Sequence, residues 1–335
     1  MPRHVAVIIP NLGLYGGNLR YLELGNELTR RDVDFTIATP EGAAPPYFDY
    51  HGRMATIDEL RADPPEVLLA SEQRIFPEFL EFPADRRFFY FIIEKTARER
   101  EIAEAGRAGR VTLLANSSGM RRRLSRLYRA DAVPVIGGVN PATFRPPADD
   151  ERERKPPGRF RVAANGRFSR RKKGTRIVVK AVHGLARKRA RRERLELALF
   201  DTTTVDTAAG IPADLQCRAR LRLHRDIPRD SLRTFYGSAD VFVSAEKKAG
   251  WSNPTIEAMA CGCPVICTRS GTTDFAVHGE TALVVPRTAW HVRRAVRRLM
   301  DDDALRQRLA AAGLERARTF TWERTADRLL DAIGY

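Results

Sequence analysis

The chain has 335 residues, 43% of them hydrophobic and 30% charged, which excludes a disordered chain and is typical of a globular protein with two domains of ordinary size. Its formal net charge is +16, and residues 151–200 hold 18 Lys or Arg against 4 Asp or Glu. No apolar run approaches the roughly 20 residues of a membrane-spanning helix, and no signal-peptide cleavage site follows the first apolar run. We therefore expect a cytoplasmic protein.

The basic stretch at 151–200 favours a ligand that carries phosphate, or an anionic membrane surface on which the protein is peripheral. The sequence does not choose between these two, and a solvated arginine-rich surface is the alternative without a ligand. Nucleic acid is disfavoured, because the stretch holds only three aromatic residues that could stack on bases and no RNA-binding signature.

A metal site is not expected. The four cysteines fit no zinc spacing, and three of them, Cys261, Cys263 and Cys267, flank or lie in an apolar segment that suits buried thiols. The acidic run at 301–303 is expected to cap a helix that begins at Ala304. Neither pattern needs a metal ion or another cofactor.

Short apolar runs alternate with amphipathic stretches along the first half of the chain, a pattern that predicts strand–helix–strand units of a parallel sheet. The strands are expected at 5–9, 34–38, 67–70, 88–93, 111–115 and 133–139. An amphipathic helix is expected after Gly16 and Gly17, which we place in the loop that follows the first strand.

The second half repeats this alternation. Strands are expected at 160–164, 195–200, 220–224, 241–243 and 265–267, and helices at 177–186, soon after Pro228 with Asp230 or Ser231 as the cap, and from Pro254. The fold class is therefore α/β, with two doubly wound domains. Ligands of such sheets bind at the carboxyl ends of the strands, here expected at the cleft between the two halves.

The loop before Pro254 carries the most informative motif. Gly250 and Asn253 suit a tight turn, and a loop that leads into a helix N-terminus presents backbone N–H groups that favour phosphate. Glu257, expected in the first helical turn, could accept hydrogen bonds from a sugar diol. An acid in a first turn also stabilises the helix dipole by roughly 0.3–1 kcal/mol without any ligand. Together these features indicate nucleotide recognition.

This segment resembles the donor-binding signature of the family-4 glycosyltransferases, retaining enzymes of the GT-B fold that use nucleotide sugars. Their Glu-x7-Glu motif runs through a Gly-Phe-Gly-x-Pro-like loop into Glu-Ala-Met-Ala-x-Gly-x-Pro-Val. Here Gly250, Trp251, Ser252 and Asn253 begin the loop, and Glu257 is the second glutamate. The resemblance implies that these residues bind the nucleotide sugar and that Glu257 contacts the ribose.

The first glutamate of the motif is replaced by Ala249, whose methyl group accepts no hydrogen bond. In the family this glutamate contacts the transferred sugar. Glu246, or Ser252 and Asn253, are alternatives for that contact. A donor that lacks the usual hydroxyl pattern and a protein without catalytic activity are two further explanations.

Other segments match the family in the same order along the chain. Gly16 and Gly17 resemble the glycine loop near the donor phosphates, for which an ordinary turn is the alternative. Arg167 and Lys173 resemble the two cations that hold the diphosphate, and fixed cations suit a leaving group on which negative charge develops. A basic surface loop is the competing explanation. Because the spacing is one residue longer than usual, Lys172 is an alternative to Lys173.

Glu94 follows the strand at 88–93, near the place where many relatives have a histidine that faces the sugar. We therefore count it with Arg167 and Lys173 among the catalytic candidates, although it could equally be an acid at a helix start. The segment at 138–146 resembles the hinge that ends the N-terminal domain, and 320–324 resembles the element before a terminal helix that returns to that domain.

The resemblance implies two Rossmann-like domains that face each other across a cleft. Their expected extents are an acceptor-side domain at 1–147, a linker at 148–158, a donor-binding domain at 159–319 and a returning terminal helix at 320–335. The implied function is metal-free, retaining transfer of a sugar from a nucleoside diphosphate sugar to an unidentified sugar, lipid or polymer acceptor in glycan biosynthesis. The alternatives are a sugar-nucleotide epimerase of the same fold and a non-catalytic protein that binds nucleotide or polyanion.

Overall fold

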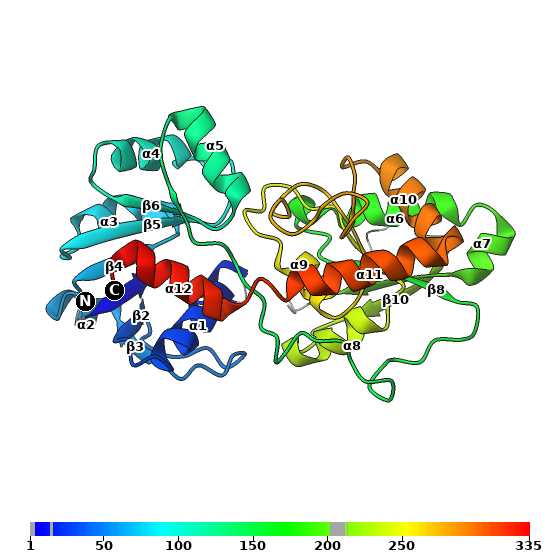
Figure 1. The fold of residues 1–335 in the computed structure, drawn as a ribbon, viewed down its shortest axis with the longest axis horizontal. Helices are drawn as coiled ribbons and strands as arrows, with labels where there is room; N and C mark the ends of the chain where they lie inside the picture. The colour runs from blue at the N-terminus through cyan, green and yellow to red at the C-terminus, as the bar shows by residue number, and fades with distance from the viewer. Residues whose placement is uncertain (1–3, 14–15, 202–211, 213) are drawn as a thin grey trace. The chain divides into compact units, whose positions relative to one another are not determined.

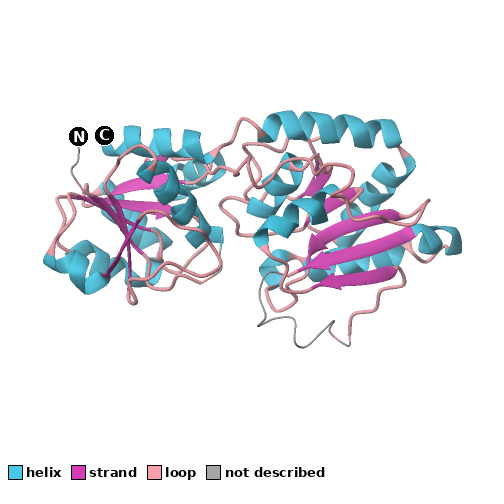
Figure 2. Cartoon of the chain, turned by 90° about the horizontal axis from the view of Figure 1, so that it is seen from below, coloured by secondary structure: helices cyan, strands magenta, loops and turns pink. Residues whose placement is uncertain are grey.

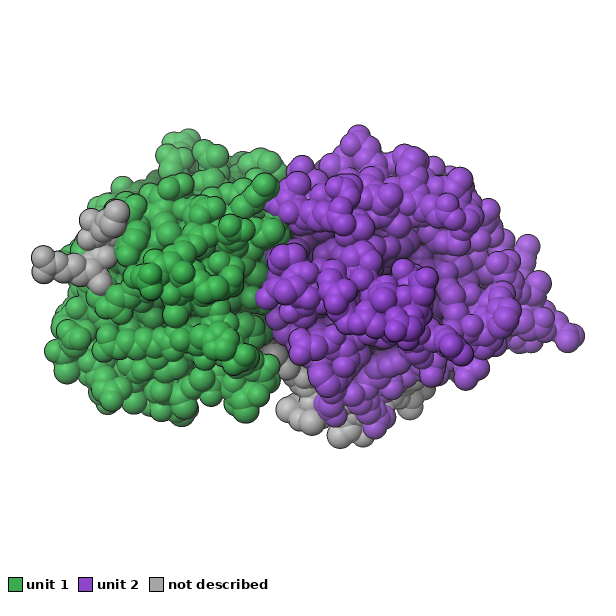
Figure 3. Space-filling view, turned by 60° about the horizontal axis from the view of Figure 1, so that its bottom comes forward, with its two compact units in different colours: residues 1–138, 249–251, 320–335 green, residues 139–248, 252–319 purple. Residues whose placement is uncertain are grey.

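The computed structural model describes residues 4–13, 16–201, 212 and 214–335, which fall into two compact units. Unit 1 comprises residues 1–138, 249–251 and 320–335, and unit 2 comprises residues 139–248 and 252–319 (Figure 3). Each unit has one parallel sheet with helices packed on its faces (Figures 1 and 2). The predicted α/β class with two doubly wound sheets is therefore confirmed.

Unit 1 contains a seven-stranded parallel sheet with strand order β3-β2-β1-β4-β5-β6-β7. The strands are β1 (Val5–Ile8), β2 (Phe35–Thr39), β3 (Arg53–Thr56), β4 (Val67–Ala70), β5 (Arg86–Phe91), β6 (Thr112–Ala115) and β7 (Val133–Pro134). The helices are α1 (Gly16–Thr29), α2 (Ile57–Ala62), α3 (Phe76–Glu81), α4 (Glu99–Arg107), α5 (Ser118–Tyr128) and α12 (Trp322–Ile333).

Both faces of the unit 1 sheet are covered, which explains why its central strands are continuous apolar runs. Side chains alternate along β1: Ala6 and Ile8 pack in the core under α3, α4 and α5, while Val5 and Val7 pack in the core under α1 and α12. The terminal helix α12 contributes Leu329 to this second core and lies against α1.

Unit 2 contains a six-stranded parallel sheet with strand order β10-β9-β8-β11-β12-β13. The strands are β8 (Phe160–Asn165), β9 (Leu195–Phe200), β10 (Arg220–His224), β11 (Val241–Ser244), β12 (Val265–Cys267) and β13 (Leu283–Val284). The helices are α6 (Thr175–Leu185), α7 (Arg189–Arg194), α8 (Leu232–Gly237), α9 (Asn253–Ala260), α10 (Ala289–Asp301) and α11 (Asp303–Ala317). The core on one face joins β8, β9 and β11 to α6 and α10.

Several local expectations need correction. Gly16 and Gly17 lie in the first turn of α1 and not in a loop before it. Ser231 precedes α8 but makes no capping hydrogen bond with its side chain. The edge strand β3 was missed, because its only buried residue is Ala55 and its sequence has no apolar run. The expected cap of α11 is confirmed, since the Asp302 carboxylate accepts a hydrogen bond from the Leu305 N–H at 2.9 Å.

Within the described part of the chain, no helix combines the length and the apolar character that crossing a bilayer would require.

Candidate functional site

The strand order of unit 2 places its candidate site. Since β8 lies between β9 and β11, the connections that leave β8 and β11 diverge to opposite faces of the sheet. Open parallel sheets bind ligands in the crevice that this divergence leaves at the carboxyl ends of the strands. Arg167 follows the end of β8 and Glu246 follows the end of β11, so both lie at this switch point.

Gly174 brings Lys173 to the same place. Lys173 ends a short 3₁₀ turn at Arg171–Lys173, and Gly174 precedes α6 with a φ of 77°, a conformation that favours glycine. A Cβ atom on Gly174 would lie well under 3.0 Å from the carbonyl oxygen of Ala245. The backbone before α6 therefore approaches the end of β11 more closely than any side chain at 174 would allow.

The close approach lets Lys173 form an ion pair with Glu246, whose side chain is 7% exposed. The Ser252 hydroxyl donates to Oε2 of Glu246 at 2.6 Å, and the Thr268 hydroxyl donates to its backbone carbonyl at 2.6 Å. Burial raises the pKa of Glu246, but the charge of Lys173 and the hydrogen bonds from Lys173 and Ser252 lower it by more, so the net pKa lies below the ordinary value. Glu246 is therefore a buried, ionised carboxylate.

Arg167 is also paired with a buried acid. Its Nε lies 3.7 Å from Oδ1 of Asp201, a fully buried residue directly after β9. The loop that carries Arg167 is fixed at Asn165, whose side-chain oxygen accepts from the Arg167 N–H at 3.0 Å. Asp201 was not predicted from the sequence, although an acidic residue directly after a buried strand could have indicated a site residue at the carboxyl end of that strand. Both predicted cations thus meet a buried carboxylate from a neighbouring strand end.

Arg287 connects the segment that carries Lys173 to the segment that carries Glu246. Its Nε donates to the Ala245 carbonyl at 2.8 Å, and its terminal nitrogen donates to the Arg171 carbonyl at 2.8 Å. No sequence motif pointed to Arg287, since it lies in a loop 42 residues from Ala245. Lys172 remains near the site: burial first, and then the charges of Lys173 and Arg170, lower its pKa.

Glu257 lies in the second turn of α9, because the helix begins at Asn253. The expectation that it lies in the first turn is wrong, and the helix dipole therefore gives no reason for an acid at this position. Glu257 is 8% exposed and accepts a hydrogen bond from the Tyr236 hydroxyl at 3.2 Å. Ser252 is the N-cap of α9 but makes no capping hydrogen bond with its side chain, since its hydroxyl faces Glu246 and Thr255.

Ala249, Gly250 and Trp251, at the start of the signature segment, group with unit 1. Ala249 pairs with Ile93 in an isolated antiparallel bridge. A Cβ atom on Gly250 would lie 2.5 Å from Oδ1 of Asn116, so the backbone packs tightly here. The Trp251 ring packs 5.5 Å from that of Phe320, centroid to centroid. The loop predicted to bind the nucleotide is therefore divided, with Ser252 and Asn253 in unit 2.

Glu94 follows β5 in unit 1, one residue after the partner of Ala249. Burial raises its pKa, while Arg123 and Lys95 oppose the shift. Gly17 lies beside the same strand end, since a Cβ atom on it would lie 2.5 Å from Cδ1 of Ile92. In unit 1, Gly17, Ala249 and Glu94 therefore gather at the carboxyl end of β5.

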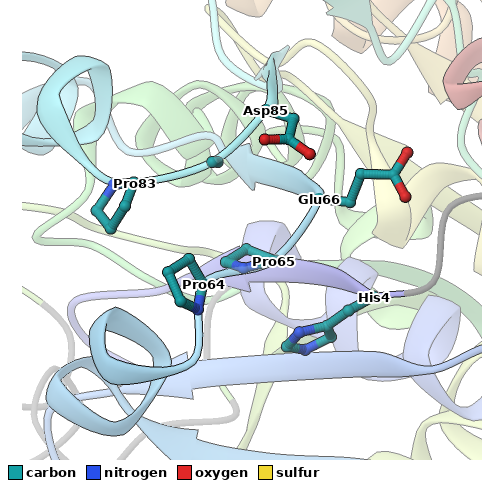
Figure 4. Close-up of a pocket in the computed structure, with 7 residues that line it drawn as sticks. His4, Pro64, Pro65, Glu66, Pro83 and Asp85 are labelled. Carbon is teal, nitrogen blue, oxygen red and sulfur yellow. The ribbon is translucent and has the colours of Figure 1, made fainter.

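One pocket of unit 1 lies at the opposite edge of the sheet (Figure 4). Its lining residues precede β1, β4 and β5: they are His4, Pro64, Pro65, Glu66, Pro83, Ala84 and Asp85. None of the predicted site residues lies there, and it faces away from the carboxyl ends of the strands. We therefore do not assign a substrate to it.

Cys261, Cys263 and Cys267 are buried free thiols, as expected, and burial raises the pKa of Cys267 to about 12. The described residues contain no group of three or more His, Cys, Asp or Glu side chains that could hold a metal ion.

Comparison with known proteins identifies the family. Residues 159–302, which include the switch point and α9, match the family model described as Glycosyl transferases group 1. Residues 159–302 belong to the group 1 glycosyltransferase family. The D-inositol 3-phosphate glycosyltransferase of Pseudarthrobacter chlorophenolicus is 31% identical over 252 residues, which cover 70% of this chain and 58% of the relative. The chain thus spans less than two thirds of the length of that curated relative.

Solved glycosyltransferase structures confirm the predicted GT-B fold. Sucrose-phosphate synthase from Thermosynechococcus elongatus superposes with a TM-score of 0.76 at 18% identity, covering 99% of this chain and 98% of the other. The Anabaena protein HepE, solved in complex with UDP-glucose, superposes with a TM-score of 0.73 at 12% identity and covers 99% of both chains. The chain therefore shares its fold with these two proteins over nearly its whole length.

Proposed function

We propose that this protein transfers a sugar from a nucleoside diphosphate sugar to an acceptor. The observation that carries the proposal is the convergence of Arg167 and Lys173 at the switch point of unit 2, each held by a buried carboxylate. Cations fixed before the reaction stabilise the charge that develops on a departing diphosphate without a reorganisation cost. Membership of the group 1 family supports the same chemistry.

Glu257 is proposed to bind the ribose of the donor. Its nearly buried carboxylate accepts a hydrogen bond from the Tyr236 hydroxyl, and a carboxylate is the type of acceptor that binds the hydroxyls of a sugar diol. Ser252 and Asn253 at the start of α9, with Gly250 and Trp251 before them, complete the proposed donor-binding residues. The donor base stays open, and UDP is the first choice because HepE is solved with UDP-glucose.

Unit 1 is proposed to bind the acceptor, with Glu94 in contact with one of the reacting sugars and Gly16 and Gly17 near the phosphates. The departing diphosphate is the natural base for the attacking hydroxyl, and the acceptor would then enter from the face that the diphosphate leaves, which retains the anomeric configuration. Arg167 and Lys173 supply the charge that a metal ion would otherwise provide. The acceptor screen begins with inositol phosphates, because curated relatives are named for them.

The first experiment is calorimetric titration of the protein with UDP, GDP, ADP and TDP, repeated on Glu257→Gln. We expect one nucleotide to bind in the micromolar range and the variant to weaken it at least tenfold. Tyr236→Phe is the matched control, since it removes the hydroxyl partner of Glu257 and leaves the carboxylate in place. Hydrolysis or transfer of the matching nucleotide sugar then tests for an enzyme.

The outcomes separate the alternatives. Specific binding without turnover of any nucleotide sugar would support a non-catalytic nucleotide-binding protein. Conversion of the free nucleotide sugar to an epimer would support the epimerase. Equal, weak binding of all four nucleotides that vanishes with salt would leave only a protein that binds polyanions.

An anionic membrane surface is a second proposed partner. The structure divides the basic stretch in two: residues 167–173 lie at the carboxyl edge of the unit 2 sheet, whereas α7 directly precedes β9 at the opposite edge. Arg187, Lys188 and Arg189 are exposed there.

Replacement of Arg187, Lys188 and Arg189 by Glu should abolish sedimentation with phosphatidylglycerol vesicles. The same change at the exposed Arg100, Arg107 and Arg110 of unit 1 should not affect sedimentation. The cytoplasmic location stays a prediction.

A further inference from the structure

Both carboxylate oxygens of Glu246 have partners inside unit 2. Oε1 contacts the Lys173 ammonium, and Oε2 accepts from the Ser252 hydroxyl at 2.6 Å. The Ser252 hydroxyl also lies 2.7 Å from that of Thr255 in the first turn of α9. A continuous polar chain therefore runs from Lys173 through Glu246 and Ser252 to α9.

The backbone around this chain is fixed on each side. Gly174 is packed against the carbonyl of Ala245, and Arg287 bonds both that carbonyl and the carbonyl of Arg171. The Thr268 hydroxyl holds the carbonyl of Glu246 itself. Because these contacts fix the chain before and after Glu246, its carboxylate is presented to Lys173 in one geometry.

These contacts exclude the idea that Glu246 takes over the sugar contact of the glutamate replaced by Ala249. A carboxylate that accepts from sugar hydroxyls needs accessible lone pairs, but the Glu246 side chain is 7% exposed and both of its oxygens are engaged. Its role must therefore act through Lys173 or Ser252.

We propose that Glu246 is a positioning residue that holds Lys173 toward the diphosphate of the donor and, by sharing its charge, limits how tightly the diphosphate product is retained. The proposal rests on the proposed function, because it presumes that Lys173 contacts the diphosphate. A lysine paired with a fixed carboxylate is oriented before the ligand arrives. The same carboxylate repels the product, so Lys173 stabilises the departing group without binding it irreversibly.

The experiment compares Glu246→Gln with the unmodified protein in nucleotide binding and in turnover of the nucleotide sugar. We expect turnover to fall at least tenfold, because Lys173 loses its orientation. The dissociation constant for the nucleoside diphosphate should stay equal or become several-fold smaller, because one negative charge has been removed beside the ligand. Glu193→Gln is the matched control: it removes an ion-paired glutamate of the same unit at the opposite edge of the sheet, and both values should stay unchanged.

A purely structural role for Glu246 would overturn the proposal, and it would appear as parallel losses of nucleotide affinity and turnover. If Glu246→Gln does not fold, Ser252→Ala tests the same chain: turnover should fall with no gain in affinity, and unchanged turnover would overturn the proposal. Lys173→Met separates the two hypotheses. If it leaves nucleotide binding and turnover unchanged, the diphosphate assignment of the proposed function fails; if it weakens them and Glu246→Gln does not affect turnover, only the positioning role fails.

Discussion

The two units share an architecture and differ in the residues that they place at the carboxyl ends of their strands. In both, the strand order reverses beside the first strand of the sheet. In unit 2, the charged pairs Arg167–Asp201 and Lys173–Glu246 lie at the carboxyl ends there. The carboxyl end of β5 in unit 1 instead holds Glu94, Gly17 and the bridge between Ile93 and Ala249. Topology therefore fixes where a site can form, and the residues at the strand ends decide its chemistry.

The largest expected effect is that of Gly174→Ala, which disrupts the close contact between the backbone before α6 and the end of β11 in unit 2. The positive φ costs an alanine roughly 1–2 kcal/mol, and the clash with the Ala245 carbonyl adds about 1–3 kcal/mol. We expect a lower unfolding temperature by calorimetry and loss of nucleotide binding. Gly158→Ala is the control, because Gly158 has a φ of 72° with no atom within 4 Å of the added Cβ. Equal effects of the two changes would contradict the close approach.

Arg167→Met and Lys173→Met should each weaken nucleoside diphosphate binding by about 1.5–3 kcal/mol, the usual contribution of a hydrogen bond to a charged group. Each change leaves a buried carboxylate without its cation, so stability should fall as well. Titration calorimetry measures the affinity. Arg189→Met, on the exposed surface of α7, provides the comparison at the other edge of the sheet and should have no effect on nucleotide affinity.

Glu94→Gln tests the proposed sugar contact in unit 1. If Glu94 contacts a reacting sugar, transfer should slow by tenfold or more, while binding of the nucleoside diphosphate, which lacks the transferred sugar, stays the same. Rate assays with the nucleotide sugar and titration with the nucleotide give the two values. A loss of nucleotide affinity equal to the loss of rate would place the effect in the donor site.

The smallest expected effect is a pH dependence of stability. The folded-state pKa of Glu246 is depressed, so the unfolded chain binds the proton at a higher pH than the folded protein does. The stabilisation from Glu246 is present above the ordinary glutamate pKa of about 4.3 and is lost as the pH falls through the lower folded value. The difference in unfolding temperature between the protein and Glu246→Gln should therefore stay constant from pH 7 to about pH 5 and become smaller as the pH falls below about 4.3. A difference that stays constant below about pH 4.3 as well would contradict the shift.

Sequence reasoning was most accurate where structure follows from local pattern. The apolar runs at 67–70 and 195–200 are strands with the expected bounds, because parallel strands covered on both faces need such runs. The strand at 220–224 was also predicted with the bounds of β10, from alternating arginine and leucine residues. The strand β3 and the helix α7 were not predicted: β3 has one buried residue and α7 is a run of charged residues, so neither has the hydrophobic pattern of its class.

The sequence alone determined the fold class, the family and the residue types available to the site: a glutamate on α9, and an arginine and a lysine after β8. The tertiary structure decided what those residues contact. Lys173 and Glu246 are 73 residues apart and meet only because β8 and β11 are neighbours and Gly174 admits a close approach. Ala249 pairs with Ile93 of unit 1 although its chain neighbours from Ser252 onward belong to unit 2. Periodicity and motifs record local preference, whereas such contacts depend on strand order and packing between segments far apart in the chain.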